Sequence, residues 1–290
     1  MNLRRLLLTL GPGILFASTA IGTSHLVQAT RAGADYGFAL LWAVLAANIA
    51  KYPFFEFGTR YANATGTSLI AGYRTFGKWA SWTYLILTTL TCAFVMGGVG
   101  IVTASFLDHL FGVSRILGFN ATPHVAVVTF TGCVGILLIG KFAALDKVIK
   151  AISLVLLIGT LGATAGALLH TPISAVPPAP ASFNPWRGAE FTFLIALLGG
   201  MPSAVDLSPW VSIWTLERYR QTGYTPRLRS ALREFNLGYA FCVVLALCFL
   251  LLGALLLRTH DMALPSGTAA FAAGIIGLYT EVLGPWSAPF

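Results

Sequence analysis

The chain has 290 residues, of which 57% are hydrophobic and only 10% are charged, and its formal net charge is +8. Soluble domains carry roughly 25% charged residues, because their surfaces must interact with water. This composition excludes a soluble enzyme, a soluble nucleic-acid-binding protein and a disordered chain, and it predicts a protein whose solvent is the lipid bilayer.

Long apolar stretches along the whole chain predict membrane-spanning helices. A hydrocarbon core of ~30 Å requires about 20 mostly apolar residues per helix, and a helix satisfies its own backbone hydrogen bonds in lipid. The sequence therefore predicts an all-α, multi-pass integral membrane protein. The predicted spans are residues 9–29, 38–58, 80–106, 123–141, 147–169, 190–213, 235–258 and 269–290.

The basic residues are distributed unevenly between the two ends of these spans. With the N-terminus inside, thirteen arginines and lysines fall at cytoplasmic ends and four at the opposite ends. Because such residues favour cytoplasmic loops, we expect a cytoplasmic N-terminus in a plasma (inner) membrane protein. The positive net charge is therefore interpreted as a topology signal, and no nucleic-acid partner is expected.

Two predicted spans contain residues that are unsuited to an uninterrupted helix. In the first span, residues 18–28 bring hydroxyl groups, a glycine and a histidine to the middle of the membrane. In the sixth, Gly199, Gly200 and Pro202 precede Asp206. Proline removes a backbone donor and glycine lowers helix propensity, so both spans are predicted to be discontinuous. Unwound backbone at this depth is tolerated where it lines a cavity.

The two interrupted spans are five apart in order, which predicts an internal repeat. Transporters with inverted repeats place their binding sites at broken helices in corresponding positions of the two halves. We therefore expect a five-plus-five inverted-repeat secondary-transporter fold. Residues 1–170 would form the first five-helix repeat, residues 171–189 a Pro-rich extracytoplasmic linker, and residues 190–290 an incomplete second repeat with helices six to eight.

The residues at the two predicted breaks form a candidate metal site. Ionisable groups inside the membrane are costly and therefore mark functional sites. Oxygen ligands suit hard cations, while imidazole and thioether groups shift the preference towards transition metals. The predicted metal ligands are Gly22, Thr23, Ser24 and His25 in the first span, and Met201, Ser203 and Asp206 in the sixth.

Each of the more distinctive ligands also has a structural interpretation. His25 could be a core histidine bonded to a neighbouring carbonyl group, Asp206 could cap a half-helix or pair with another cation, and Met201 could be a packing residue. Two charged residues of the second span, Lys51 and Glu56, are interpreted as structural, because long side chains can extend towards the interface or pair with other helices.

Several motifs resemble the natural resistance-associated macrophage protein (Nramp) family. Residues 197–214 and 235–257 are similar to the sixth and seventh helices of that family. The motifs that resemble its first two helices are Gly11-Pro12-Gly13, residues 31–38, Leu40-Leu41-Trp42 and Ala64-Thr65-Gly66. The resemblance implies the five-plus-five inverted-repeat fold and divalent-metal transport driven by a proton gradient.

The sequence departs from the family pattern at the metal-binding positions. Where the family has Asp-Pro-Gly-Asn, this chain has Gly22-Thr23-Ser24-His25, and the family's Met-Pro-His is replaced by Met201-Pro202-Ser203. The acidic run of the family's third helix falls on residues 95–99, which contain no acid. Asp206 would then supply the only formal negative charge, which favours a partly hydrated ion such as Mg²⁺.

We therefore expect a transporter of a divalent metal cation of the Mn/Fe/Mg class, with the ion held between the breaks of the first and sixth helices. Proton coupling stays open. The metal is substrate, no cofactor is expected, and no enzyme is expected because hydrolase motifs are missing from the sequence.

Two alternatives remain. One is a transporter of a small organic solute such as an amino acid, held by helix N-termini and hydroxyl groups. The other is a non-transporting truncated fragment, since the family implies at least ten helices and the sequence predicts eight.

Overall fold

Helices make up almost all of the described structure, which agrees with the expected all-α class. The computed structural model describes residues 11–22 and 24–259, and these ranges contain no β-strand. The α-helices are α2 (Pro12–Ala20), α3 (Thr30–Tyr36), α4 (Leu41–Thr65), α5 (Leu69–Thr75), α6 (Lys78–Phe111), α7 (Val113–Leu117), α8 (Thr122–His170), α9 (Gly188–Gly200), α10 (Ser208–Thr222) and α11 (Leu228–Leu252). Shorter π-helical or 3-10 elements are η1 (Ser24–Ala29), η2 (Ile173–Ala175), η3 (Val205–Leu207) and η4 (Gly253–Arg258).

Five helical stretches of the described chain are long and apolar enough to cross a bilayer, which confirms a multi-pass membrane protein. They are Lys78–Phe111, Thr122–Ile139, Val148–His170, Gly188–Thr222 and Leu228–Arg258. They correspond to the predicted third to seventh spans. The predicted first span consists of shorter helical pieces, the second lies in the less apolar helix α4, and the eighth, residues 269–290, lies outside the described residues.

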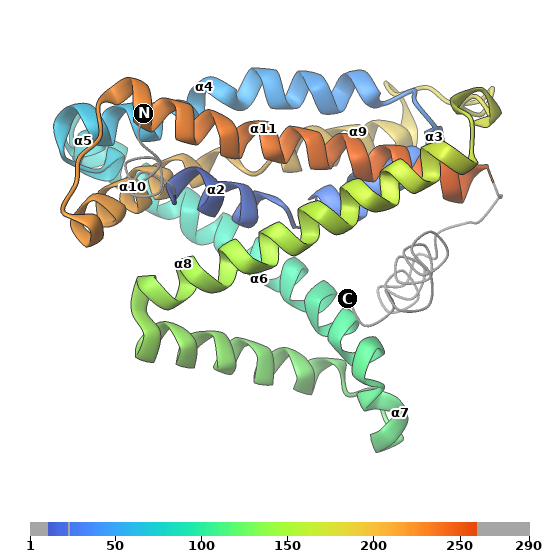
Figure 1. The fold of residues 1–290 in the computed structure, drawn as a ribbon, viewed down its shortest axis with the longest axis horizontal. Coiled ribbons are helices and arrows are strands. Elements are labelled where there is room, and N and C mark those ends of the chain that lie inside the picture. The colour runs from blue at the N-terminus through green and yellow to red at the C-terminus, as the bar shows by residue number, and fades with distance from the viewer. Residues whose placement is uncertain (1–10, 23, 260–290) are drawn as a thin grey trace.

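Helix α11 is the centre of the bundle. It packs against α2, α3, α4 and α8, and 67% of its most apolar stretch is buried. Figure 1 shows α4 running alongside it and α8 as two arms, one of which doubles back beneath the bundle. The predicted fourth and fifth spans are these two arms of a single helix.

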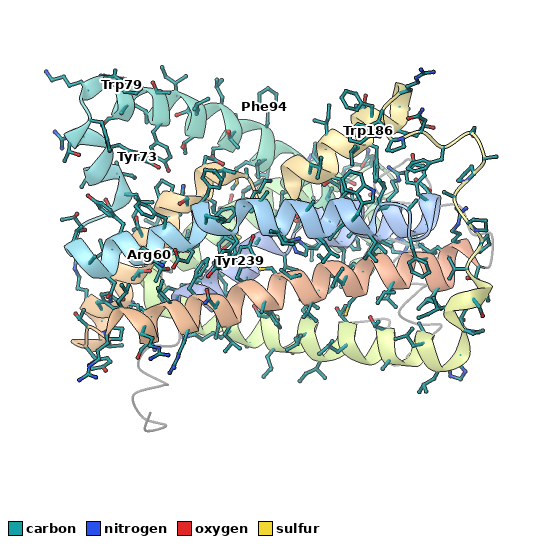
Figure 2. All side chains as sticks on the ribbon, turned by 90° about the horizontal axis from the view of Figure 1, so that it is seen from above. Arg60, Tyr73, Trp79, Phe94, Trp186 and Tyr239 are labelled. Atoms are coloured by element: carbon teal, nitrogen blue, oxygen red, sulfur yellow. The ribbon has the colours of Figure 1, made fainter. Side chains whose placement is uncertain are left out.

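Helix α6 and the first arm of α8 lie at the edge of the bundle. No residue in the most apolar stretch of either helix is buried. Figure 2 shows Trp79 and Phe94 pointing away from the bundle, and they are 69% and 81% exposed. Exposed apolar side chains on spanning helices are the surface expected to face lipid.

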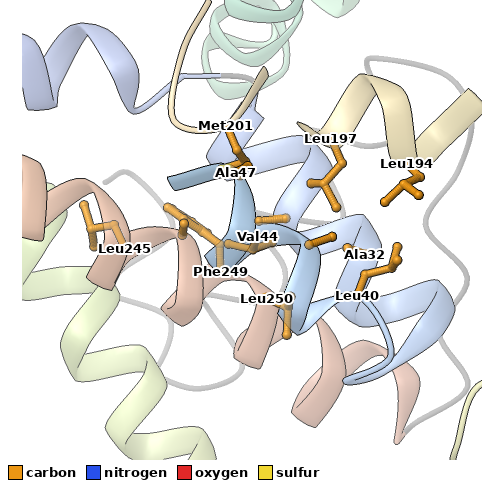
Figure 3. Packing of buried hydrophobic residues seen from close by; sticks show 13 residues of the cluster. Ala32, Leu40, Val44, Ala47, Leu194, Leu197, Met201, Leu245, Phe249 and Leu250 are labelled. Atoms are coloured by element: carbon orange, nitrogen blue, oxygen red, sulfur yellow. The ribbon is translucent and has the colours of Figure 1, made fainter. Parts of the chain in front are cut away.

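The main hydrophobic cluster joins α4, α9 and α11. Figure 3 shows Val44 between Phe249 and Leu197 within it, with Leu250 below them, and each of the four is at most 1% exposed. Because lipid tails are as apolar as these side chains, close van der Waals packing, rather than transfer out of water, stabilises such contacts in a membrane. The cluster fixes the end of α9 against α4 and α11.

Glycines allow the backbone of α2 to approach the backbone of α11 directly. A Cβ atom added at Gly13 would lie 2.6 Å from the carbonyl oxygen of Glu234. A Cβ atom added at Gly238 would overlap the carbonyl group of Gly13, and one at Gly253 would overlap the carbonyl oxygen of Thr30. Small residues that bring helices this close are the usual packing device in membranes.

Glu234 holds the N-terminal end of α2 on α11. The residue is 5% exposed, and its carboxylate accepts hydrogen bonds from the backbone N–H of Gly11 at 2.9 Å and of Gly13 at 2.9 and 3.0 Å. The first N–H groups of a helix have no partner within the helix and favour negative charge. The carboxylate therefore caps α2 from another helix.

We predict that Gly238→Ala destabilises the fold. The added methyl group would overlap the Gly13 carbonyl, and overpacking of this kind costs about 1–3 kcal/mol. The midpoint of thermal unfolding of the purified chain should fall. The control is Gly132→Ala, where nothing lies within 4 Å of the added Cβ atom and alanine has the higher helix propensity. Equal midpoints for the two variants would contradict the close contact of α2 with α11.

We also predict that Glu234→Gln lowers the thermal midpoint. The substitution removes the charge from hydrogen bonds that are each worth about 1.5–3 kcal/mol when one partner is ionised. Glu217→Gln is the matched control, because the ion pair that Glu217 forms within the described residues is with Arg220, whose side chain is 84% exposed, and such surface pairs contribute little. A Glu234→Gln midpoint that matches the control would show that the cap does not stabilise α2.

Candidate cation-binding site

The first predicted span is interrupted after Ala20. Helix α2 ends there and the π-helix η1 begins at Ser24, while Thr23 lies outside the described residues. The carbonyl oxygen of Gly22 accepts the backbone N–H groups of His25 and Leu26 at 3.1 and 3.0 Å. A side chain at Gly22 would meet nothing within 4 Å, so this turn borders open space. Single π-turns of this kind occur frequently at functional sites.

The sixth predicted span is interrupted after Gly200. Residues 201–204 are not helical, η3 follows, and α10 begins at Ser208. The N–H of Met201 still donates to the carbonyl oxygen of Leu197 at 3.0 Å, but the last carbonyl groups of a helix have no N–H partner within it. From α4, the Lys51 ammonium group donates to the carbonyl oxygen of Gly199 at 2.6 Å and to that of Ser203 at 3.1 Å.

The two breaks are in contact through Ser24 and Gln28 of η1. The hydroxyl oxygen of Ser24 lies 3.5 Å from the carbonyl oxygen of Pro202. A Cβ atom added at Gly200 would lie 3.2 Å from the Ser24 Cβ atom and 2.7 Å from the Gln28 Oε1 atom. Glycine at position 200 therefore leaves the space that these two side chains occupy.

His25 is fully buried and is held between η1 and α11. Its Nε2 atom lies 3.2 Å from the carbonyl oxygen of Cys242, and its Nδ1 atom lies 3.1 Å from the Ser24 hydroxyl oxygen. A carbonyl oxygen can only accept, so Nε2 carries the proton and donates, and Nδ1 accepts from the Ser24 hydroxyl group. This arrangement turns the Ser24 lone pairs away from His25. In this structure His25 orients Ser24.

Met201 and Asp206 lie apart from the contact between Ser24 and Pro202. The Met201 side chain is fully buried in the main hydrophobic cluster, next to Ala47 in Figure 3. Asp206 is half-buried in η3, and its backbone carbonyl accepts from the Tyr84 hydroxyl group at 3.3 Å. Its carboxylate forms no ion pair with any residue that the structure describes.

The packing of the short elements explains this separation. Element η3 packs against α4, α6 and α10, whereas η1 packs against α3, α9 and α11. The structure thus brings Ser24 to the second break and places Asp206 on the side that faces α6. Within the described ranges, no group of three or more His, Cys, Asp or Glu side chains is close enough to bind a metal ion. Oxygen atoms of neutral groups dominate the contact between the breaks.

Two residues at the site were missed by the sequence reasoning. The Gln28 Oε1 atom is buried and has no hydrogen-bond partner within the part of the chain that the structure describes. The spacing of four residues from Ser24 could have indicated it, because such residues share one face of a helix. Lys51 was interpreted as structural, and no local pattern in α4 indicates that its partners are carbonyl groups of the sixth span.

A small cavity adjoins the first break. It has a volume of about 180 Å³ and is lined by residues of α2 and of the second arm of α8, including Ser18, Thr19, Ile21 and Ser153. The Ser18 hydroxyl group contacts that of Ser153. The cavity places polar groups beside the end of α2, next to Gly22.

Comparison with known proteins identifies the family. Residues 13–273 match the model of natural resistance-associated macrophage protein-like (Nramp) proteins. Uncharacterized protein PM0681 of Pasteurella multocida (strain Pm70) is 33% identical over 279 residues, which are 96% of this chain and 63% of that protein. The chain thus spans less than two-thirds of the length of this relative. No solved structure matches the chain. Because the family match covers most of its length, the chain belongs to the Nramp family of membrane transporters, which are not enzymes.

Proposed function

We propose that this chain serves the transport of a divalent metal cation of the Mn/Fe/Mg class, and that the ion binds between the breaks of the first and sixth spans. The observation that carries the proposal is that three oxygen atoms lie along the contact of the two breaks, two of them 3.5 Å apart and the third beside Gly200. They belong to the Ser24 hydroxyl group, the Gln28 side-chain amide and the Pro202 carbonyl group. Family membership supports metal transport as the activity.

The chemistry of these three groups suits a hard cation. Oxygen ligands bind ions such as Ca²⁺ at about 2.3–2.6 Å and Mg²⁺ at about 2.0–2.1 Å. The Gln28 Oε1 atom has no partner among the described residues, and the Ser24 hydroxyl proton is directed to His25. Lone pairs of both side chains are therefore available. A cation would satisfy the buried Gln28 oxygen, whose isolation is otherwise unfavourable.

The other predicted ligands have different proposed roles. We propose that His25 orients Ser24, that Met201 forms the wall of the site, and that Gly22 and Ser203 border the space that the ion enters. The predicted ligand Thr23 lies outside the described residues. Asp206 would attract the cation from the α6 side without contacting His25.

The broken spans also suit an inverted repeat. In this proposal residues 1–170 and 190–290 are related halves joined by residues 171–189, with corresponding breaks after α2 and after α9. Facing broken helices of two such halves are where secondary transporters bind their substrates. The proposed orientation places the N-terminus in the cytoplasm, because basic residues cluster on that side of the spans.

A small organic solute is the second candidate cargo. The observation that favours it is Lys51, whose ammonium group lies at the second break, because a positive charge there would attract a carboxylate group. The Ser24 hydroxyl oxygen would then accept a hydrogen bond from an amino group of the solute. An amino acid is a solute of this class.

We predict that Gln28→Leu reduces uptake of Mn²⁺ or Mg²⁺ into vesicles that contain the purified chain. Loss of one buried oxygen ligand should weaken binding by about 1.4 kcal/mol, which is tenfold in affinity. Uptake should therefore fall about tenfold at ion concentrations below saturation. Gln221→Leu, at an exposed position of α10, is the matched control. Equal uptake by both variants would show that Gln28 does not bind the ion.

We predict that Asp206→Asn weakens cation uptake without unfolding the chain, because it removes a half-buried negative charge beside the second break. Asp35→Asn, which removes a negative charge in a long ion pair with Arg31 at 4.0 Å, is the control. Uptake that is unchanged by Asp206→Asn would exclude its carboxylate from ion binding.

If metal uptake is absent and an amino acid is taken up instead, the second candidate is correct. If neither is taken up while the chain inserts and folds, it does not transport alone.

A further inference from the structure

Lys51 is a charged residue of a predicted span whose hydrogen-bond partners among the described residues are backbone carbonyl groups and not an acidic side chain. Charged side chains within spans usually pair with one another, with backbone carbonyl groups or with water. The ion pairs between described residues are Arg31–Asp35, Arg60–Glu56 and Arg220–Glu217, and none includes Lys51. Its ammonium group instead donates to two backbone carbonyl oxygens, those of Gly199 and Ser203.

The sequence explains why these two carbonyl groups are available. Pro202 has no N–H for the carbonyl group of Leu198, and its ring interrupts the helix before the N–H of Ser203 can bond the carbonyl group of Gly199. Helix α9 therefore ends at Gly200, and its last carbonyl groups lack helical partners. The C-terminal end of a helix also carries a partial negative charge that attracts cations. Lys51 thus satisfies one carbonyl group on each side of Pro202.

This position is one where broken-helix transporters bind free ions. Unwound carbonyl groups and the C-terminal ends of half-helices are the groups that coordinate Na⁺ or protons in such proteins. A lysine ammonium group and a potassium ion are similar in charge and size. In this chain a side chain of α4 fills the place that a free monovalent cation would take.

We propose that Lys51 is a tethered monovalent cation that occupies the carbonyl oxygens of Gly199 and Ser203, holds the second break in its unwound form, and removes the need for bound Na⁺ or K⁺ there. The segment after α9 then has two separate faces. The carbonyl groups of Gly199 and Ser203 face α4 and Lys51. Gly200 and the Pro202 carbonyl group face Ser24 and Gln28 of η1.

This inference goes beyond the proposed function, because it concerns the monovalent charge at the break and not the cargo. Lys51 bonds the carbonyl groups of Gly199 and Ser203 and not that of Pro202. The Pro202 carbonyl group therefore stays available on the face where the cargo ion is proposed to bind. The inference would hold equally for a metal ion or for an organic solute. It can therefore be tested without measuring transport.

The test is the thermal stability of the purified chain in different monovalent salts, with divalent ions removed. The variant is Lys51→Met, which keeps the length of the side chain and removes its charge. We expect the wild type to unfold at the same temperature in Na⁺, K⁺, NH₄⁺ or the bulky cation N-methylglucamine. The Lys51→Met variant should unfold at a lower temperature in N-methylglucamine and recover by several degrees in K⁺ or NH₄⁺, which can enter the vacated carbonyl groups.

Two controls separate this effect from a general loss of stability. Lys78→Met, at an exposed position at the start of α6, should show no dependence on the salt. Lys51→Arg keeps the charge and should also be independent of the monovalent cation. These controls use no transport readout, so failure of the metal-transport proposal would leave the result intact.

Three results would overturn the proposal. The first is a Lys51→Met variant that is equally stable in all four salts. The second is a wild type that depends on K⁺ or Na⁺ as strongly as the variant does. The third is a Lys51→Met variant that fails to fold in every salt while Lys51→Arg folds, because a free cation should be able to replace the lost ammonium group. The proposal would be supported if the unfolding temperature of Lys51→Met rises in K⁺ or NH₄⁺ and stays low in N-methylglucamine.

Discussion

The structure of this chain depends on how backbone polar groups find partners inside a membrane. A bilayer offers no water to an unpaired N–H or carbonyl group, so unwound backbone must be bonded by the protein or line a cavity. The first break meets this requirement locally, because the Gly22 carbonyl oxygen accepts two N–H groups of the next turn. The second break meets it through Lys51, from a different helix. The two breaks are thus stabilised in different ways, and only the second uses a charge.

Helix α11 determines where the first break lies. Its Glu234 carboxylate caps α2 before the break, and its Cys242 carbonyl oxygen accepts from His25 just after it. Glycines 13 and 238 bring the two backbones into direct contact between these points. Because α11 is bonded on both sides of the interruption, a movement of α2 relative to η1 would have to break contacts with the same helix. The geometry of Ser24 therefore follows from α11 as well as from the sequence of the first span.

Local patterns in the sequence predicted much of the fold and less of the site. Apolar length located the five spans that are confirmed, and Gly199, Gly200 and Pro202 located the end of α9, because both signals act over a few residues. The position of Asp206 could not be predicted in this way. Its backbone carbonyl accepts a hydrogen bond from Tyr84, which is 122 residues away in the sequence. The partners of Lys51 in α4 are about 150 residues away. Such contacts depend on how helices pack, and hydrophobic periodicity carries no information about them.

The charges at the second break bear on which ion the proposed site would prefer. Lys51 contributes a positive charge and Asp206 a negative one, so their formal charges cancel, and Ser24, Gln28 and Pro202 add only neutral oxygens. A site without net negative charge attracts a divalent ion only weakly. This attraction does not offset the free-energy cost of removing the water shell of the ion, so the ion is better bound with part of that shell in place. Mg²⁺ loses water reluctantly and is usually bound with several waters still attached. Within the Mn/Fe/Mg class, a neutral set of oxygen ligands next to the open turn at Gly22 therefore favours the ion that can enter partly hydrated.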